Sequence, residues 1–176
     1  MSPLDPVPPI AAVTPERSTP MADMKVVAEP GTQEIVITRT FDAPRELVFK
    51  AFTDPDAVRR WWGQASSETV VDQLEARPGG RWRFVERDGK GGEDAFHGVY
   101  HDLQAPERIV YTFEYEGMPG HVLLETIVLE DQDGKTLMTD SSVYQSVADR
   151  DGMLQSGMES GAAESLDRLD DYLARG

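Results

Sequence analysis

Residues 54–63 read Asp-Pro-Asp-Ala-Val-Arg-Arg-Trp-Trp-Gly, which predicts a short helix from about Pro55 to Trp62. An aspartate before a proline is a typical helix start, and the glycine that follows is a typical helix end. Side chains of neighbouring helical residues point about 100° apart, so Trp61 and Trp62 cannot both face the same core. We therefore expect at least one of these indoles to border a cavity or an edge, which favours a binding cleft.

The spacing of apolar side chains predicts the elements on either side of this stretch. Side chains of residues 33–41 alternate in the pattern expected of a first strand. Pro44 then fits the first turn of another short helix, which Asp42 could cap. After residue 147 the apolar period becomes helical, which predicts one long helix from about Ala148 to Ala174. Between them lie six strand-like segments separated by turn signals: 68–76, 81–87, 94–103, 108–116, 121–130 and 135–144. Short turns favour antiparallel neighbours, so these seven strands should form a meander.

Aromatic side chains gather on one face of this predicted sheet. Because side chains alternate between the two faces of a strand, Trp82 and Phe84 share one face, and so do Tyr111 and Phe113. An inward aromatic ring usually fills a hydrophobic core. The helix that faces the sheet, however, has only small side chains around Gly161 and would leave space next to these rings. We therefore predict a cavity between sheet and helix, and the candidate ligand-binding residues are Trp62, Trp82, Phe84, Tyr100, Tyr111, Phe113, Met158 and Ala162.

Several short motifs, in this order, resemble one known family. They are Phe41-Asp42-Ala43-Pro44, Thr53-Asp54-Pro55, Trp61-Trp62-Gly63, Pro78-Gly79-Gly80, Phe96-His97-Gly98-Val99-Tyr100, Pro106-Glu107-Arg108 and a final helix pattern that begins at Gly157-Met158-Glu159. Over roughly residues 33–174 the chain resembles the AHSA family, activator of heat-shock-protein-90 ATPase homologues, within the SRPBCC superfamily, also called START or Bet v 1-like.

The resemblance implies an α+β helix-grip fold. In that fold a curved antiparallel sheet, here of about seven strands, wraps around a long C-terminal helix and an apolar cavity, and two short helices follow strand 1. It implies little about chemistry, because superfamily members bind lipids, cyclise polyketides, hydrolyse small molecules or assist chaperones. It also carries no universal catalytic residue onto this chain.

Composition limits the domain organisation and the partners. The chain has 176 residues, and residues 1–30 hold seven of its twelve prolines. We expect 1–30 to be a disordered tail and 31–176 to be one domain. Disulfides and thiolate sites are excluded because there is no cysteine. The net charge of −15 disfavours nucleic acids and anionic membranes as partners. Since no export signal and no membrane-spanning run is present, we expect a cytoplasmic protein.

Histidines, serines and carboxylates are the residues of this chain that could carry chemistry. On a strand His97 and His101 would lie about 13 Å apart, too far for one ion, so no metal and no cofactor is predicted. No G-x-S-x-G motif occurs, and Ser141 and Ser142 read as ordinary strand residues. One of the carboxylates could be a buried general base, but the sequence does not single it out. The candidates are Glu114, Glu116, Glu125 and Asp140.

These observations favour binding of a small apolar or aromatic ligand in an internal cavity rather than catalysis. Two alternatives stay open: an enzyme of the same fold, such as a polyketide cyclase, dehydratase or hydrolase, and a co-chaperone-like protein that stimulates an ATPase through its surface. A homodimer or another protein partner is also left open. A buried His, Glu or Asp in the cavity would favour the enzyme, a wholly apolar cavity would favour binding, and a flat apolar surface patch would favour the partner role.

Overall fold

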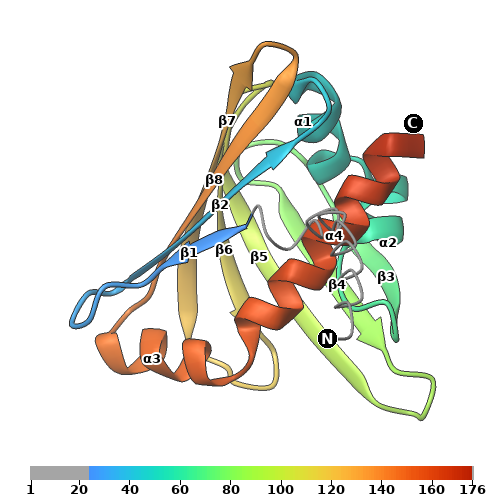
Figure 1. Cartoon of the computed structure of the whole chain (residues 1–176). Helices are drawn as coiled ribbons and strands as arrows, with labels where there is room; N and C mark the ends of the chain where they lie inside the picture. The colour runs from blue at the N-terminus through green and yellow to red at the C-terminus, as the bar shows by residue number, and fades with distance from the viewer. Residues whose placement is uncertain (1–23, 176) are drawn as a thin grey trace, which may run out of the picture.

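A single curved sheet of eight antiparallel strands dominates the computed structural model, which describes residues 24–175 (Figure 1). The strands are β1 (Lys25–Val27), β2 (Glu34–Phe41), β3 (Glu68–Leu74), β4 (Arg81–Arg87), β5 (Glu93–Gln104), β6 (Arg108–Tyr115), β7 (Val122–Gln132) and β8 (Lys135–Val143). Their order across the sheet is β1-β2-β8-β7-β6-β5-β4-β3. From β3 to β8 each strand pairs with the next one in the chain, which confirms the predicted meander for these six strands. The first predicted strand, β2, pairs with β8 and not with β3, because helices α1 and α2 separate β2 from β3 in the chain.

Four helices complete the fold. Two short helices, α1 (Arg45–Thr53) and α2 (Pro55–Trp61), follow β2, while α3 (Val147–Gln155) and α4 (Met158–Arg175) follow β8. Figure 1 shows α4 crossing the concave side of the sheet. The α+β helix-grip architecture is therefore confirmed. None of the helices within residues 24–175 is both long enough and apolar enough to span a bilayer.

The eighth strand, β1, was not predicted. It pairs with β2, with Val26 opposite Ile37 and Val27 opposite Val36. The predicted tail 1–30 therefore contains a strand of the sheet, and its remaining residues 1–23 lie outside the described residues. Three residues are too few to show an alternating pattern, so β1 left no periodic signal in the sequence.

The predicted single C-terminal helix was wrong, because two helices occupy that part of the chain. The break falls at Gly157, whose φ of 85° lies in the left-handed region that cannot continue a right-handed helix.

Side-chain capping differs between α1 and α2. Asp54 caps α2 as predicted, accepting a hydrogen bond from the Asp56 amide at 2.8 Å, whereas Asp42 does not cap α1, whose N-cap is Pro44.

The packed core lies under α1 and α2. Helix α1 packs against β7 and β8, and the Thr136 hydroxyl of β8 donates to the Ala43 carbonyl at 2.7 Å. Side chains at this end have almost no exposed surface; they include Phe41, Val48, Val58, Ile109, Ile127, Leu129 and Met138. Farther along the same concave face, Phe96, Phe113 and Glu125 keep part of their surface exposed. The concave side is thus filled at one end and more open toward α3.

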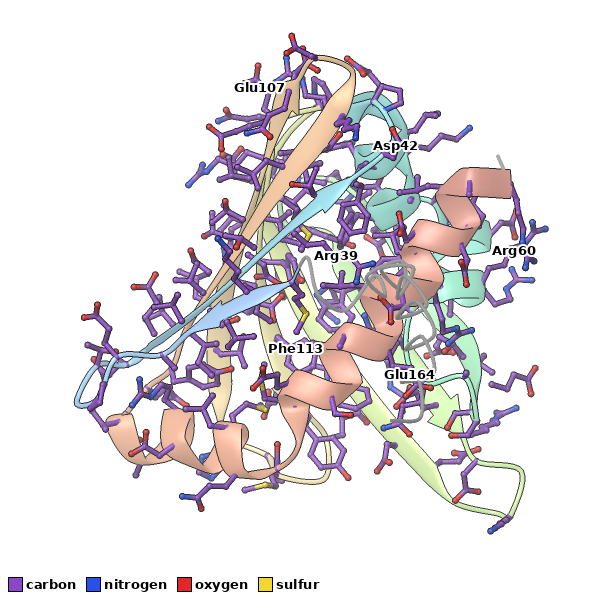
Figure 2. The ribbon with its side chains drawn as sticks, in the orientation of Figure 1. Arg39, Asp42, Arg60, Glu107, Phe113 and Glu164 are labelled. Atoms are coloured by element: carbon purple, nitrogen blue, oxygen red, sulfur yellow. The ribbon has the colours of Figure 1, made fainter. Side chains whose placement is uncertain are left out.

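A buried arginine fastens α4 to the far side of the sheet. Arg39 of β2 is 1% exposed, and its guanidinium reaches Asp167 at 2.7 Å and Asp170 at 3.5 Å (Figure 2). Desolvating this cation is costly, so the two aspartates are required to compensate for its burial. The pairing fixes which turns of α4 face β2.

Truncation distinguishes β1 from the residues before it. We predict that deleting residues 1–30 lowers Tm by more than about 5 °C, roughly 1 kcal/mol or more, because it removes the strand that pairs with β2. Deleting only residues 1–23 is the matched control and should leave Tm within about 1 °C. Thermal denaturation of the two truncated proteins and the full chain measures both effects. Equal stability of all three would mean that β1 adds nothing to the fold.

Candidate functional site

The two indoles at the end of α2 point in different directions. Trp61 is buried, and its Nε1 donates to the Ala51 carbonyl at 2.8 Å while its ring meets Phe52 edge-on at 4.9 Å. Trp62 already has extended backbone angles, so its ring turns toward the sheet. The centroid of this ring lies 5.2 Å from that of Phe84 and 5.3 Å from that of Phe96. The helix end thus places one indole in the core and one over the concave face.

Gly63 allows this turn and is bound directly to α4. Its φ is 90°, and a Cβ at this position would lie 2.1 Å from Oε1 of Glu86. The Gly63 amide donates to Ser165 Oγ, and the Ser165 hydroxyl can donate back to the Gly63 carbonyl, both at 3.0 Å. Arg168 donates to the carbonyls of Gly63 at 2.9 Å and Arg60 at 2.9 Å. These contacts hold the turn, and with it the Trp62 ring, against the helix.

A second contact from α4 supports the same loop. The carboxylate of Glu164, labelled in Figure 2, accepts a hydrogen bond from the Ala65 amide at 2.7 Å. On the other side, the Thr69 hydroxyl donates to the Trp62 carbonyl at 2.6 Å. The loop after α2 is therefore fixed both to α4 and to β3.

Rings from β4, β5 and β6 form a continuous aromatic wall. Trp82 lies at its centre, with ring centroids 4.8 Å from Phe84, 5.9 Å from Tyr111 and 5.5 Å from Phe113. The indole Nε1 of Trp82 donates to the Thr112 carbonyl at 3.2 Å across Gly98. A Cβ on Gly98 would lie 1.7 Å from that carbonyl oxygen, so only glycine lets the indole lie flat on the sheet.

These rings enclose a small cavity beside α2. It is lined by Phe52, Val58, Trp61, Trp62, Trp82, Phe84, Tyr100, Ile109, Tyr111 and Phe113. The space that the centre of a water molecule can occupy in this cavity has a volume of about 40 Å³. About 10–15 Å³ is needed for one water, so the cavity has room for a few water molecules and not for a large ligand.

The structure brings six of the eight predicted ligand-binding residues together at this cavity: Trp62, Trp82, Phe84, Tyr100, Tyr111 and Phe113. The other two, Met158 and Ala162, lie on α4 and pack against the core without lining the cavity. Ala162 keeps part of its surface exposed, while the neighbouring Ala163 is buried. The first turns of α4 therefore border a more open part of the concave side.

Two acidic side chains lie on the same concave face, next to the aromatic wall. Glu125 of β7 is opposite Tyr111 of β6, whose hydroxyl donates to its carboxylate. Asp140 of β8 is opposite Ile127, one inward position farther along β7. Its Oδ1 has no exposed surface and no hydrogen-bond partner within residues 24–175. Tyr111 therefore joins the apolar cavity to a pair of carboxyl groups.

Burial controls the protonation of this pair. Desolvation raises the pKa of Glu125, although the hydrogen bonds from Tyr111 and Ser142 work in the opposite direction. Desolvation also raises the pKa of Asp140 well above its ordinary value, and the nearby charge of Glu125 raises it further. The pKa of the Tyr111 hydroxyl is raised by burial first and by Glu125 second. Burial is thus the main cause of a raised pKa at all three groups.

The alternation rule could have found this pair in the sequence. Glu125 is in phase with the buried Leu123, Ile127 and Leu129, and Asp140 is in phase with Met138. By contrast, Glu114 and Glu116 lie on the outer face, where they flank His97 at 3.3 and 3.0 Å. Within residues 24–175, no cluster of three or more His, Cys, Asp or Glu side chains is arranged to hold a metal ion.

Comparison with known proteins agrees with this architecture. Residues 42–174 match the family model described as "Activator of Hsp90 ATPase homolog 1-like protein". The chain belongs to this family. No curated protein matches the sequence.

Solved structures from several bacteria share the fold. A protein from Rhodobacter sphaeroides has a TM-score of 0.80 at 23% identity, with 88% of this chain and 99% of that chain covered. One from Arthrobacter aurescens has a TM-score of 0.79 at 23% identity, covering 86% and 92%. A third, from Chromobacterium violaceum, has a TM-score of 0.69 at 27% identity, covering 80% and 96%. The helix-grip arrangement is thus common to this chain and its relatives.

A larger hollow lies away from the aromatic wall. It has a volume of about 480 Å³ and is lined by Arg60, Arg168, Asp171, Tyr172 and Arg175. Most of these side chains are charged and exposed, whereas pockets for small molecules are mainly apolar and enclosed. The smaller aromatic cavity therefore remains the better candidate site.

Two glycine substitutions test the packing of the aromatic wall. We predict that Gly98→Ala lowers stability by more than about 2 kcal/mol, because the new Cβ collides with the Thr112 carbonyl and displaces Trp82. Gly161→Ala on α4 is the matched control, since a Cβ there meets nothing within 4 Å. It should raise stability by up to about 1 kcal/mol through helix propensity. Chemical denaturation gives both values, and a tolerated Gly98→Ala would contradict this description of Trp82.

The carboxyl pair predicts a specific pH dependence. The pKa of Asp140 is higher in the fold than in the unfolded chain. The contribution of its neutral carboxyl to stability is therefore fully present below about pH 4 and is lost as the pH rises through the pKa of the folded state. Asp140→Asn removes this loss, so its stability relative to the native chain should increase with pH by up to about 1.4 kcal/mol per unit. Glu130→Gln, on the exposed face of β7, is the control and should show no such slope. Denaturant titrations from pH 4 to 8 measure both differences.

Proposed function

We propose that this domain binds a small aromatic or apolar molecule between the sheet and α4. The observation that carries the proposal is the cavity whose lining comes almost wholly from aromatic and aliphatic side chains of α1, α2, β4, β5 and β6. Such a lining binds by shape and ring contact, as small-molecule sites commonly do. The net charge of −15 argues against nucleic acids as ligands.

The size of the cavity limits how a ligand enters. At about 40 Å³ it is too small for a polyketide or a fatty acid as it stands. The concave side is more open beyond it, where Phe96 and Phe113 meet at 5.5 Å and remain partly exposed. Met158 and Ala162, in the first turns of α4, are partly buried and pack against the core. We infer that the ligand places one ring in the cavity and extends along this open part.

An enzyme of the same fold is the second candidate, and one observation favours it. Glu125 and Asp140 are partly buried residues next to the aromatic wall, and desolvation raises the pKa of both carboxyl groups. Of two neighbouring carboxyl groups, the protonated one can act as a general acid and the ionised one as a base. A cyclase or dehydratase reaction would use such a pair on a ligand that lies against Tyr111.

Stimulation of an ATPase, which the family description suggests, has less support from the described surface. The exposed large apolar side chains of residues 24–175 are spread over separate elements; they are Val27, Leu47, Met118, Leu124 and Val143. Of these, Leu124 and Val143 lie opposite each other on β7 and β8. Two side chains are a small patch for docking a protein partner.

Native mass spectrometry of freshly purified protein tests the binding proposal most directly. We expect a small molecule to co-purify and to be released on denaturation. In parallel, a panel of fatty acids, flavonoids and aromatic polyketides should change tryptophan fluorescence in a saturable way, because Trp62 and Trp82 line the cavity. Recovery of a chemically altered compound would favour the enzyme. If nothing co-purifies and no member of the panel saturates, the binding proposal fails.

Substitution on α4 tests where the ligand lies. We predict that Ala162→Trp changes stability by less than about 1 kcal/mol, because its side chain is partly exposed and a full core would lose about 1–3 kcal/mol on overpacking. It should also weaken binding of bulky panel members at least tenfold by occupying their space. Ala174→Trp, at an exposed position on the same helix, is the matched control and should leave binding unchanged. Unchanged affinity in Ala162→Trp would place the ligand elsewhere.

A further inference from the structure

The carboxyl pair of Glu125 and Asp140 has no counter-charge within the described protein. Neither carboxyl forms an ion pair with a basic side chain of residues 24–175. The two buried arginines of that region are engaged elsewhere. Arg39 pairs with Asp167 and Asp170 of α4, and Arg150 pairs with Asp151. The pair is therefore a concentration of acidic groups on a wall that the fold does not neutralise.

The groups around the pair supply hydroxyls and rings instead of cations. Tyr111 donates to Glu125, and Ser142 lies opposite Glu125 on β8. Tyr144 lies just beyond β8, and its pKa is raised by burial first and by the nearby charge of Glu125 second. The Glu125 carboxylate is thus supported by hydroxyl donors, while the buried Oδ1 of Asp140 has none. A buried carboxylate oxygen without a donor is unfavourable, so a donor supplied by a ligand would be favoured at this carboxyl group.

The aromatic wall adjoins this unsatisfied acid. Tyr111 lines the cavity and also donates to Glu125, and its ring packs against Trp82 at 5.9 Å and Tyr100 at 6.0 Å. Ring faces attract cations, and carboxylates attract them more strongly. A molecule with a ring at one end and a positively charged nitrogen at the other would therefore meet complementary groups at both ends.

We propose that the Glu125 and Asp140 carboxyl groups bind the ammonium group of a small aromatic amine whose ring lies against the cavity wall. This inference rests on the proposed binding function and names the chemical class of its ligand. The ammonium donates hydrogen bonds to both carboxyl groups, and its charge offsets the repulsion between their ionised forms. A neutral ligand of the same shape makes only the ring contacts.

Three probes with one ring and different end groups test the proposal. They are phenethylamine, which is cationic, 2-phenylethanol, which is neutral, and phenylacetate, which is anionic. None absorbs where tryptophan is excited, so binding is measured by fluorescence and confirmed by calorimetry at pH 7.5. We expect phenethylamine to bind at least tenfold more tightly than 2-phenylethanol, and phenylacetate to bind most weakly.

Variants assign the preference to the carboxyl pair. Asp140→Asn and Glu125→Gln should reduce the preference for phenethylamine over 2-phenylethanol to less than about threefold. Glu130→Gln removes one negative charge from the exposed side of β7 and should keep the full preference. Thermal denaturation of each variant confirms that it is folded.

The outcomes separate this proposal from the more general one. If 2-phenylethanol binds and phenethylamine binds no better, the amine site is refuted while the aromatic cavity stands. If the preference persists in both carboxyl variants, it comes from the overall negative charge and the proposal is also refuted. If none of the three probes saturates, the amine site and single-ring binding in the cavity both fail.

Discussion

The architecture depends on how one amphipathic helix is fastened across a curved sheet. Helix α4 is tied on one side by Arg168 and Ser165, which bind backbone groups of the turn at Gly63. On the other side it is tied by Asp167 and Asp170, which pair with the buried Arg39. Because these residues all lie within residues 165–170, the middle of α4 is fixed on both sides. Its first turns carry small side chains and leave the adjoining concave surface partly open.

This arrangement places two kinds of chemistry side by side. Strands β4 to β6 supply rings, and β7 and β8 supply carboxyl groups, so the boundary between them falls at Tyr111 and Glu125. A purely apolar wall would recognise shape alone, and a purely acidic one would be filled by water. In the proposed function, the combination would give a bound ligand a defined orientation.

The sequence was sufficient for most of the fold, since the alternation along the strands and the turn signals mark seven of the eight strands, which are β2 and the six strands after residue 67. It was insufficient where a signal was too short or involved few residues. Strand β1 has three residues, and the break before α4 depends on the backbone angle of Gly157. The aromatic part of the candidate site followed from periodicity. Alternation also places Glu125 and Asp140 in phase with buried residues of their strands. Their raised pKa values, however, depend on burial by residues that are distant in the chain, which no local pattern records.

The position of α4 in the chain has a consequence for biosynthesis. The contacts that fasten it join residues 128 and 102 positions apart, Arg39 with Asp167 and Gly63 with Ser165. Such long separations slow folding, because the intervening chain must be ordered before the contact can form. A ribosome adds roughly 5–20 residues per second, and α4 follows every strand. The aromatic wall is therefore synthesised several seconds before its cover, so the nascent chain exposes an apolar surface at the stage when chaperones and aggregation compete for it.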